Sequence, residues 1–346
     1  MKRTALYFVA PERVEIIEEE ISAPQKNQVM VRTLVSAISP GTEMLFYRGH
    51  VPEELPMDVS IAALQGKKAV YPFKYGYASV GEVVEIGEDV AKTWIGERVF
   101  SFHPHESLYL ADLSEVMIVP EEIPTGGAVF LPTMETAVNF TMDGHPIIGE
   151  AVAVFGLGIV GLMTTSLLSG FPLGILLTFD RYPFRRAEAL NVGVDASLDP
   201  AEPDSAERAA AILKKAGWES GVDLTFELSG TPSALNQAIA VTGFDGRIVI
   251  GSWYGKKTAE IDLGGKFHRS RIRLISSQVS TVSPALSGRW DKQRRLKVSW
   301  EQILKIRPQR WVTHRFPFAD APKAYHLLEE HPEETLQILF DYPMGE

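Results

Sequence analysis

Apolar and polar residues follow two different patterns along the chain, and the change falls near residue 150. Before it, short apolar or alternating runs are separated by Gly, Pro and acidic residues, which predicts a β-rich region with many turns. The runs expected to form strands there are Val29–Val35, Gly81–Ile86, Arg98–Phe102 and Glu115–Val119. From Ala151 on, continuous apolar runs alternate with helical stretches, so we expect a parallel sheet covered by helices on both faces.

The second pattern predicts strands at 151–155, 174–180, 222–230, 246–254 and 273–280, with helices in LMTTSLLSG (162–170) and RRAEALNVG (185–193). After about residue 281 the chain reads as a polar connection that contains tryptophan. It ends in a helix at Ala321–Glu330 and a last strand, LQILFDY. Because one short helix and one strand cannot form a core, we expect this tail to fold back onto the first domain.

Length and composition indicate a globular protein of two domains. A chain of 346 residues is too long for one typical core, and 45% apolar with 23% charged residues is an ordinary balance. The net charge of −10 argues against binding to nucleic-acid phosphates. Two basic clusters are expected at the surface, open to solvent or to a small anion: Arg269, Arg271 and Arg273, and Lys292, Arg294 and Arg295.

The chain contains no cysteine, which excludes disulfides, thiolate nucleophiles and thiolate metal sites. Its N-terminal segment lacks the apolar region of a signal peptide, and no apolar stretch approaches the ~18 residues of a membrane span. These features predict a cytoplasmic protein that does not contact membranes.

The strongest motif is the run Gly156-Leu157-Gly158-Ile159-Val160-Gly161, between a predicted strand and a predicted helix. In a dinucleotide-binding turn the first glycine permits the tight turn, the second lets the backbone approach a pyrophosphate, and the third allows close helix–strand packing. N–H groups at the helix start receive the phosphates. The required acid is Asp180, 19 residues after Gly161 and at the end of the second strand.

Asp180 favours NAD over NADP, because its carboxylate accepts ribose hydroxyls and repels a 2′-phosphate. Arg181, with Arg185 and Arg186, keeps NADP possible, since an arginine can bind that phosphate. At the ends of two later strands, Ser229-Gly230 and Gly251-Ser252 either contact the cofactor or only form strand-to-helix turns.

Several segments together resemble the medium-chain dehydrogenase/reductase superfamily. They are residues 76–90, IGERVF (95–100), VPEEIP (119–124), the glycine-rich turn, and residues 180–199 and 314–329. The resemblance implies a GroES-like catalytic domain, residues 1–120 with 281–346, and a Rossmann domain, residues 121–280, with the active site between them. It also implies a homodimer or homotetramer.

In the zinc-dependent branch of this superfamily, a cysteine, a Gly-His-Glu triplet and a third ligand hold the catalytic metal. This chain has Ser39-Pro40-Gly41-Thr42-Glu43 at the first place, Gly76-Tyr77-Ala78 at the second, and Leu131–Glu135, without cysteine or histidine, at the third. The four-cysteine structural lobe is missing as well. Because zinc needs three strong protein ligands, we expect no bound metal.

The SPGTE turn, the GYASVG form and SGRW (287–290) make the chain similar to the branch that contains hydroxyethyl-bacteriochlorophyllide dehydrogenase and its relatives. This likeness implies a reaction type more than a substrate.

Without a metal, a positioned hydrogen-bond donor must polarise the substrate carbonyl. Tyr77 stands where the family has its ligand histidine, and it either donates from its neutral phenol or only fills the vacated space. Thr42 lies near the family's proton relay, although threonine also stabilises turns. His50 either relays a proton or is solvated. Glu43 resembles an acid that the family pairs with arginine as a structural anchor.

Three further observations leave alternatives open. His103 and His105 share a face of an extended segment but lack a third metal ligand. Thr136 resembles the family's contact to the nicotinamide, or it caps a helix. Eight aromatic residues either line a large apolar pocket or belong to the core: Phe46, Tyr47, Tyr71, Phe73, Tyr75, Trp253, Tyr254 and Trp290.

These observations predict a metal-independent NAD(P)-dependent oxidoreductase that transfers hydride between nicotinamide and a secondary alcohol or ketone. A zinc-less quinone or enone reductase is the first alternative. A non-catalytic nucleotide-binding sensor is the second, motivated by the missing metal ligands.

Overall fold

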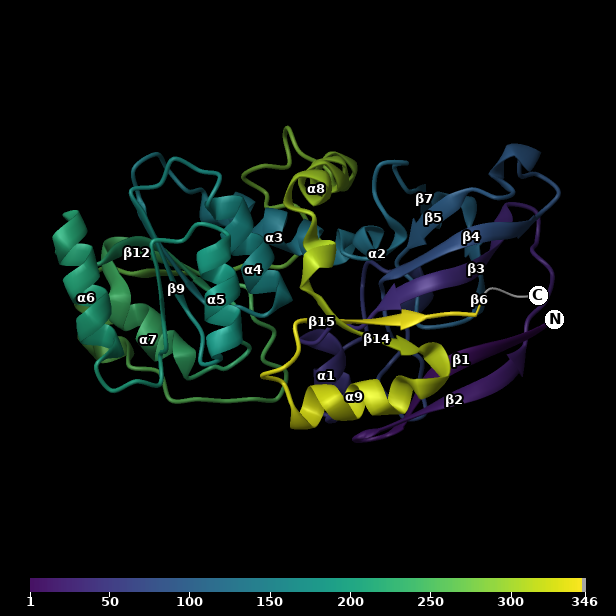
Figure 1. Cartoon of the computed structure of the whole chain (residues 1–346), viewed down its shortest axis with the longest axis horizontal. Helices are drawn as coiled ribbons and strands as arrows, with labels where there is room; N and C mark the ends of the chain where they lie inside the picture. The colour runs from purple at the N-terminus through teal and green to yellow at the C-terminus, as the bar shows by residue number, and fades with distance from the viewer. Residues whose placement is uncertain (344–346) are drawn as a thin grey trace. The chain divides into compact units, whose positions relative to one another are not determined.

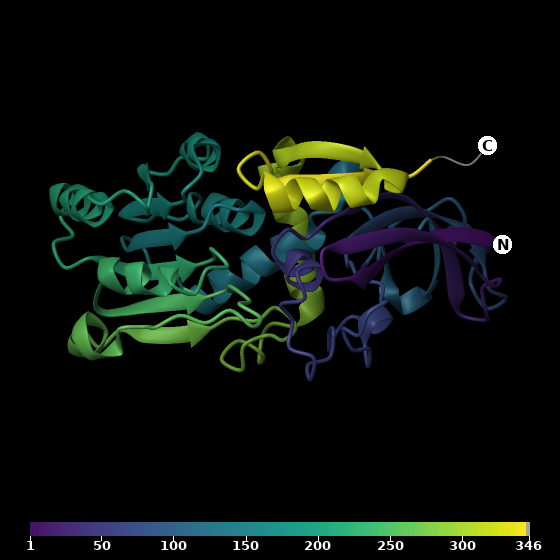
Figure 2. The same ribbon diagram turned by 90° about the horizontal axis from the view of Figure 1, so that it is seen from below.

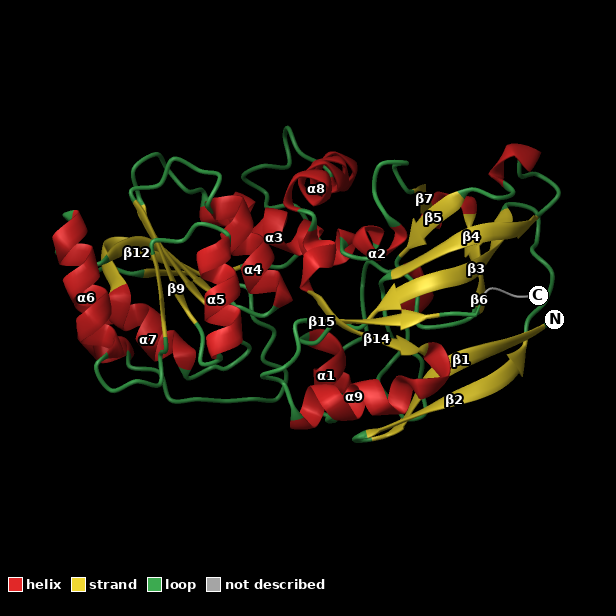
Figure 3. Ribbon diagram, in the orientation of Figure 1, coloured by secondary structure: helices red, strands yellow, loops and turns green. Residues whose placement is uncertain are grey.

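The structure is a computed structural model that describes residues 1–343 (Figure 1). Two compact units make up the chain. The β-rich unit comprises Met1–Pro132 and Ile303–Glu346, and the Rossmann unit comprises Thr133–Gln302. Figure 3 shows that strands dominate the first unit, whereas helices and strands alternate in the second. No helix in the described part of the chain is both long and apolar enough to span a membrane.

A six-stranded parallel sheet with the strand order β10-β9-β8-β11-β12-β13 forms the centre of the Rossmann unit (Figure 2). This order places a topological switch point between β8 and β11, where doubly wound sheets bind ligands. The predicted parallel sheet is confirmed. Its strands are β8 (Ala151–Phe155), β9 (Ile175–Phe179), β10 (Ala196–Leu198), β11 (Val222–Glu227), β12 (Thr242–Ile250) and β13 (Arg273–Ser276).

Helices cover both faces of this sheet because its strands are apolar on both sides. Side chains of α6 and α7, such as Leu213 and Ile239, join the core on one face, and Phe140 of α3 packs at Gly251 of the chain after β12. The helices are α3 (Leu131–Gly144), α4 (Ile159–Leu168), α5 (Pro183–Asn191), α6 (Ser205–Ala216), α7 (Ala234–Val241) and α8 (Lys292–Ile306).

The β-rich unit contains a second sheet with the order β14-β15-β3-β4-β5-β7, in which β6 also pairs with β3, and a separate β1–β2 hairpin. The C-terminal strand β15 pairs antiparallel with β3, so the tail completes the first domain as predicted. The elements are β1 (Lys2–Ala10), β2 (Arg13–Glu20), β3 (Gln28–Ala37), α1 (Thr42–Tyr47), β4 (Ser79–Ile86), β5 (Arg98–Ser101), β6 (Leu108–Asp112), β7 (Val116–Ile118), α2 (Thr125–Ala128), β14 (Val312–Pro317), α9 (Ala321–Glu330) and β15 (Gln337–Asp341).

The polar connection expected after residue 281 contains the 15-residue helix α8, so that part of the prediction is wrong. Residues four apart form its buried face, and these are Arg295, Ser299 and Ile303. Two of the three are polar, and the apolar period that reveals a helix is therefore absent. Arg295, expected in a surface cluster, is fully buried.

The boundaries of the two units fall at 132/133 and 302/303, whereas the sequence places them at 120/121 and 280/281. The difference arises because α3 and most of α8 belong to the Rossmann unit. Arg295 of α8 donates to Glu135 and Asn139 of α3, and these polar contacts carry no apolar pattern.

Candidate functional site

The glycine-rich turn joins β8 to α4, and its glycines have the geometry that a pyrophosphate cradle requires. Gly156 has a φ of +90°, and a Cβ there would lie 2.5 Å from the Cα of Ser229. A Cβ on Gly161 would lie 1.9 Å from the carbonyl oxygen of Gly156. At Gly158 a Cβ would meet only a guanidinium nitrogen of Arg185, at 3.9 Å, so the backbone there is open to a ligand. These residues fit a bound dinucleotide.

Between these glycines, the side chains of Leu157 and Ile159 are buried, so both residues face a ligand only through their backbone. The N–H of Leu157 donates to Oδ2 of Asp180 at 2.7 Å and is therefore already used. Helix α4 begins at Ile159. The N–H groups of Ile159 and Val160 are therefore the ones that remain available to bind phosphates.

Asp180 follows β9 and is 6% exposed. Its Oδ1 accepts the N–H of Tyr182 at 2.8 Å, and its Oδ2 lies 4.0 Å from Arg185. Arg181 is exposed and stacks on the ring of Tyr182. The carboxylate is thus held in a fixed orientation, with an exposed guanidinium beside it.

Replacing Asp180 by Asn is expected to shift the ratio of kcat/KM for NAD to that for NADP by at least about tenfold toward NADP. The amide keeps one acceptor oxygen but removes the charge that repels a 2′-phosphate. Steady-state kinetics with both cofactors would measure the ratio. Asp195→Asn is the matched control, since Asp195 also accepts a backbone N–H, that of Leu176. An equal shift in both variants would contradict the assignment of Asp180.

The predicted residues after β11 and β12 come together. Ser252 Oγ accepts the N–H of Gly230 at 2.8 Å, and Ser229 donates through its N–H and its hydroxyl to Glu227. Glu227 is fully buried and also accepts the hydroxyl proton of Tyr254. The sequence analysis missed Glu227, although an acid at the end of an apolar strand is a visible signal.

Two of the predicted cofactor contacts have a clear structural setting. A Cβ on Gly251 would lie 2.4 Å from the ring of Phe140, so helix packing alone requires this glycine. Thr136 lies in the second turn of α3, which removes helix capping as its alternative role.

In the β-rich unit, Tyr77 and Thr42 lie in one hydrogen-bonded group with Ser39. The hydroxyl of Tyr77 is 2.5 Å from Ser39 Oγ and 3.3 Å from Thr42 Oγ1. Burial raises the pKa of Tyr77 to about 12, although the hydrogen bonds to Ser39 and Thr42 lower it in part. The phenol is therefore neutral and able to donate throughout the physiological range.

Glu43 follows Thr42 in the chain and is fully buried. The expected pairing of Glu43 with an arginine is wrong. Its Oε1 accepts the N–H of Ser39 at 2.8 Å, and its Oε2 accepts from His105 Nε2 at 3.1 Å and from the hydroxyl of Tyr325. A histidine and a tyrosine thus hold the carboxylate in place of an arginine.

The structure does not bring His50 to this group. Its side chain is exposed after α1, and in the described part of the chain no hydrogen bond links it to Tyr77 or Thr42. His103 and His105 make separate contacts. The ring of His103 stacks on Tyr109 at 3.9 Å, whereas His105 is hydrogen-bonded to Glu43.

The donors present do not fit a catalytic zinc. Ser39 and Tyr77 occupy the positions of the family's first two zinc ligands, and their hydroxyls are hydrogen-bonded to each other. At the third position, Glu135 forms an ion pair with Arg295. Within residues 1–343, the only close group of three acidic or imidazole side chains is the exposed set His331, Glu333 and Glu334. At these three positions the structure therefore offers no set of three strong ligands with an open position.

His103 makes the stability of the protein sensitive to acid. Burial lowers its pKa from 6.5 to about 4, and Glu106, 3.9 Å away, offsets this only in part. As the pH falls from about 6.5 to about 4, His103 is protonated in the unfolded chain but stays neutral in the folded protein, so the free energy of unfolding decreases. The loss approaches about 3 kcal/mol, at about 1.4 kcal/mol per pKa unit.

We expect His103→Phe, which keeps the stacking on Tyr109, to remove this part of the acid lability. Urea unfolding at pH 7 and pH 4.5 would measure it. Parallel pH dependences of the variant and the parent would show that His103 does not contribute.

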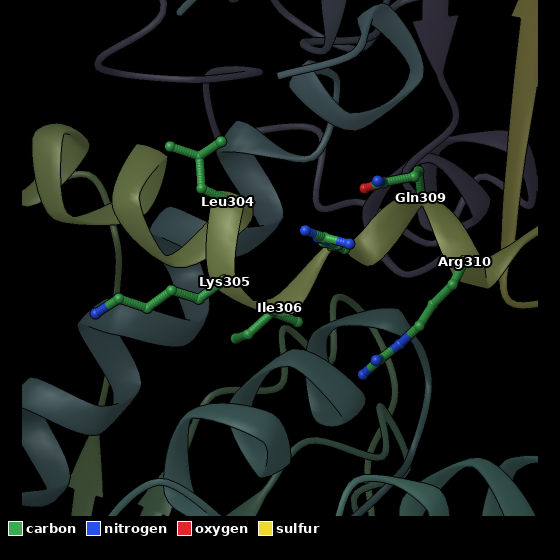
Figure 4. A pocket seen from close by; sticks show the side chains of 6 residues that line it. Leu304, Lys305, Ile306, Gln309 and Arg310 are labelled. Carbon is green, nitrogen blue, oxygen red and sulfur yellow. The ribbon is translucent and has the colours of Figure 1, made fainter. Parts of the chain in front are cut away.

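A hollow of about 620 Å³ in the β-rich unit is lined by residues from the end of α8 onward, three of them basic (Figure 4). Its lining residues are Leu304, Lys305, Ile306, Arg307, Gln309 and Arg310, and none is a predicted site residue.

Of the eight aromatic residues that the sequence assigns to either a pocket or the core, Phe46, Tyr47, Phe73 and Tyr75 belong to the core.

Comparison with known proteins gives the family. Residues 160–292 match the family model described as zinc-binding dehydrogenase. The (R,R)-butanediol dehydrogenase of Bacillus subtilis is 30% identical over 72% of this chain and 76% of its own length. The chain belongs to the medium-chain dehydrogenase/reductase superfamily.

Two further proteins match over nearly the whole chain. The D-guloside 3-dehydrogenase of Escherichia coli is 24% identical over 96% of this chain and 98% of its own. An alcohol dehydrogenase of Escherichia coli CFT073, solved with NADH, has the same fold, with a TM-score of 0.78, 19% identity and coverage of 98% and 99%. This protein is therefore a medium-chain dehydrogenase/reductase. The segment matched by the zinc-binding family model, 160–292, contains neither Ser39 nor Tyr77.

Proposed function

We propose that this enzyme transfers hydride between a nicotinamide and a secondary alcohol or ketone without a metal. The observation that carries the proposal is the direct hydrogen bond between Tyr77 and Ser39. These two residues occupy the positions at which zinc-dependent relatives keep their first two ligands. A neutral donor thus stands where a Lewis acid would polarise the carbonyl.

The residues that hold the cofactor belong to the Rossmann unit. The open backbone at Gly158 and the start of α4 bind the pyrophosphate, and Asp180 accepts the ribose hydroxyls, which favours NAD. Ser229 and Ser252 are fixed by Glu227 and Gly230 at the ligand-binding edge of the sheet. When bound, the nicotinamide supplies or accepts the hydride.

The β-rich unit handles the proton. In the reductive direction Tyr77 donates its hydroxyl proton to the carbonyl oxygen and takes up a proton from the hydroxyl of Ser39, which regains one from solvent. In the oxidative direction Tyr77 receives the alcohol proton while it passes its own proton to Ser39, and from there to solvent. Ser39 and Thr42 fix the position of the phenol oxygen, and its single proton turns from Ser39 to the carbonyl oxygen when the substrate binds. His50 has no place in this step.

A zinc-less quinone or enone reductase and a non-catalytic nucleotide sensor are the competing functions. A quinone or enone reductase is expected to favour NADPH, whereas the carboxylate of Asp180 disfavours the 2′-phosphate of that cofactor. The second predicts tight cofactor binding without turnover. A cytoplasmic location, a homodimer or homotetramer, and the absence of nucleic-acid and membrane partners stay predictions.

A substrate panel tests the proposed function. Absorbance at 340 nm would follow oxidation of 2,3-butanediol and a D-guloside, and reduction of cyclohexanone and 1,4-benzoquinone, with both cofactors. We expect turnover of alcohols or ketones with NAD or NADH. Turnover of the quinone alone, or tight NADH binding with no turnover, would favour one of the competing functions.

Metal analysis of the purified enzyme is expected to find less than about 0.1 zinc per chain, and dialysis against a chelator should leave kcat unchanged, because the family's three ligand positions lack strong zinc ligands. One zinc per chain, lost together with activity, would overturn the metal-free mechanism.

A further inference from the structure

His105 is a fully buried residue with both ring nitrogens engaged. Its Nδ1 lies 2.7 Å from Ser36 Oγ, and its Nε2 lies 3.1 Å from Glu43 Oε2. The ring of Phe340 packs edge-on against it at 5.2 Å. These contacts fix the imidazole on every side, so its orientation is set by the fold.

The hydrogen-bond partners also fix where the imidazole carries its proton. A carboxylate only accepts, so Nε2 donates to Glu43, and in the neutral imidazole Nδ1 then accepts from the hydroxyl of Ser36. Ser36 in turn lies 2.9 Å from the hydroxyl of Tyr342, which supplies the next proton of the chain. In this tautomer His105, Glu43, Ser36 and Tyr342 each have a hydrogen-bond partner.

Through Glu43, this imidazole reaches Ser39. The same carboxylate that receives Nε2–H accepts the backbone N–H of Ser39 at 2.8 Å with its other oxygen. The hydroxyl of Tyr325 bonds to the first oxygen as well. A movement of Glu43 would therefore move the turn that presents Ser39 and Thr42.

On its other side, the imidazole touches the backbone that presents Tyr77. Gly76 has a φ of +124°, and a Cβ there would lie 2.8 Å from Cδ2 and 2.9 Å from Nε2 of His105. The ring thus packs directly on the glycine before Tyr77. One side chain contacts both supports of the Tyr77–Ser39 pair.

We propose that His105 is a positioning residue, which holds Ser39 through Glu43 and Tyr77 through Gly76 so that the phenol is aimed at the substrate. The inference rests on the proposed function, in which Tyr77 is the proton donor. A misplacement of about 1 Å costs on the order of 100-fold in rate, so a partial loss of this support should be visible in kcat.

Two amide substitutions separate the contacts of the imidazole. His105→Gln extends an amide nitrogen toward Glu43 and retains the donor at Nε2. His105→Asn places its amide near Nδ1 and leaves Glu43 without that donor. We expect Asn to lower kcat about tenfold or more and Gln to stay within about threefold of the parent. The dissociation constant of NADH, from fluorescence titration, should not change in either.

His103→Phe is the matched control, because His103 lies two residues away but faces Tyr109 rather than Glu43. Kinetics would use the panel substrate with the highest turnover, and circular dichroism would check folding. If His105→Asn does not fold, Glu43→Gln takes its place, since it retains an acceptor for Ser39 but weakens the bond to the imidazole. Equal kcat values for the parent and the Asn variant would overturn the proposal.

A double-mutant cycle with Tyr77→Phe distinguishes this inference from the proposed function. If His105 acts through Tyr77, His105→Asn should have no further effect on kcat once the hydroxyl is gone. Independent, multiplying losses would refute positioning. An unchanged kcat in Tyr77→Phe itself would refute the proposed function instead.

A spectroscopic readout tests positioning without any substrate. In protein labelled with ¹³C at Cζ of tyrosine, the Tyr77 resonance is assigned as the one that Tyr77→Phe removes. We expect the chemical shift of this resonance to change in His105→Asn and to remain that of the parent in His105→Gln and His103→Phe. A resonance that stays in all three variants would overturn the proposal.

Discussion

Tyr77→Phe is expected to lower kcat by at least about 100-fold while the dissociation constant of NADH stays the same. The substitution removes only the hydroxyl that lies 2.5 Å from Ser39 and leaves the ring packed edge-on to Tyr75. Positioned proton donors contribute roughly 10²- to 10⁴-fold to a rate. Stopped-flow measurement of a single turnover would separate the chemical step from product release.

Tyr71→Phe is the control for this prediction. Tyr71 is also partly buried, and its hydroxyl donates to the carbonyl of Phe46 at 2.6 Å, outside the Tyr77 group. We expect its kcat within about twofold of the parent. Equal values for both variants and the parent would transfer the donor role to Thr42 or Ser39.

The pH profile supplies a second check on Tyr77. Because burial raises its pKa to about 12, the phenol remains a donor far above neutrality. In the reductive direction, kcat should therefore show no loss from Tyr77 ionisation below about pH 10. A decline with an apparent pKa near 8 would point to another donor.

The parallel sheet and the glycine-rich turn of the Rossmann unit were predictable because their signals are local. Continuous apolar strands specify a parallel sheet, and the spacing of Gly156, Gly158, Gly161 and Asp180 follows from the fixed geometry of one turn and the next strand. The structure adds the reason Gly156 and Gly161 are needed, since a Cβ on either would overlap backbone atoms, and it shows open space at Gly158.

The candidate catalytic group was only partly predictable because its parts are far apart in the chain. Tyr77 and Thr42 were found from their positions in the family pattern. Ser39 was noted only as a replaced ligand, and its bond to Tyr77 depends on how the turn before α1 meets the chain before β4. His105 and Ser36 are 69 residues apart, and no local pattern links such a pair.

The buried polar contacts of α8 were beyond the reach of any hydrophobic pattern, and they carry the second large expected effect. Arg295 uses all five of its N–H donors. Nε and one NH2 proton bind Glu135, the NH1 protons bind Asn139 and the carbonyl of Thr281, and the other NH2 proton binds the carbonyl of Val279. These bonds join α3, α8 and the chain after β13.

Arg295→Met is expected to destabilise the Rossmann unit by about 3–5 kcal/mol, because it leaves the carboxylate of Glu135 buried without its cation. Urea unfolding would measure the change. Arg294→Met, one residue away on the exposed face, is the control, with an expected change below about 1 kcal/mol. A similar small change for Arg295→Met would show that the pair is dispensable.

The pH dependence of that loss identifies its cause. Burial raises the pKa of Glu135 above 4.5, and the nearby Arg295 opposes the shift. Without the arginine the pKa should rise further, so the folded variant binds a proton that the unfolded chain releases above about pH 4.5. The destabilisation should therefore be smaller near pH 4 and grow toward pH 7. Adding Glu135→Gln to Arg295→Met should remove this growth, because the amide cannot ionise, whereas a loss of packing alone would persist at every pH.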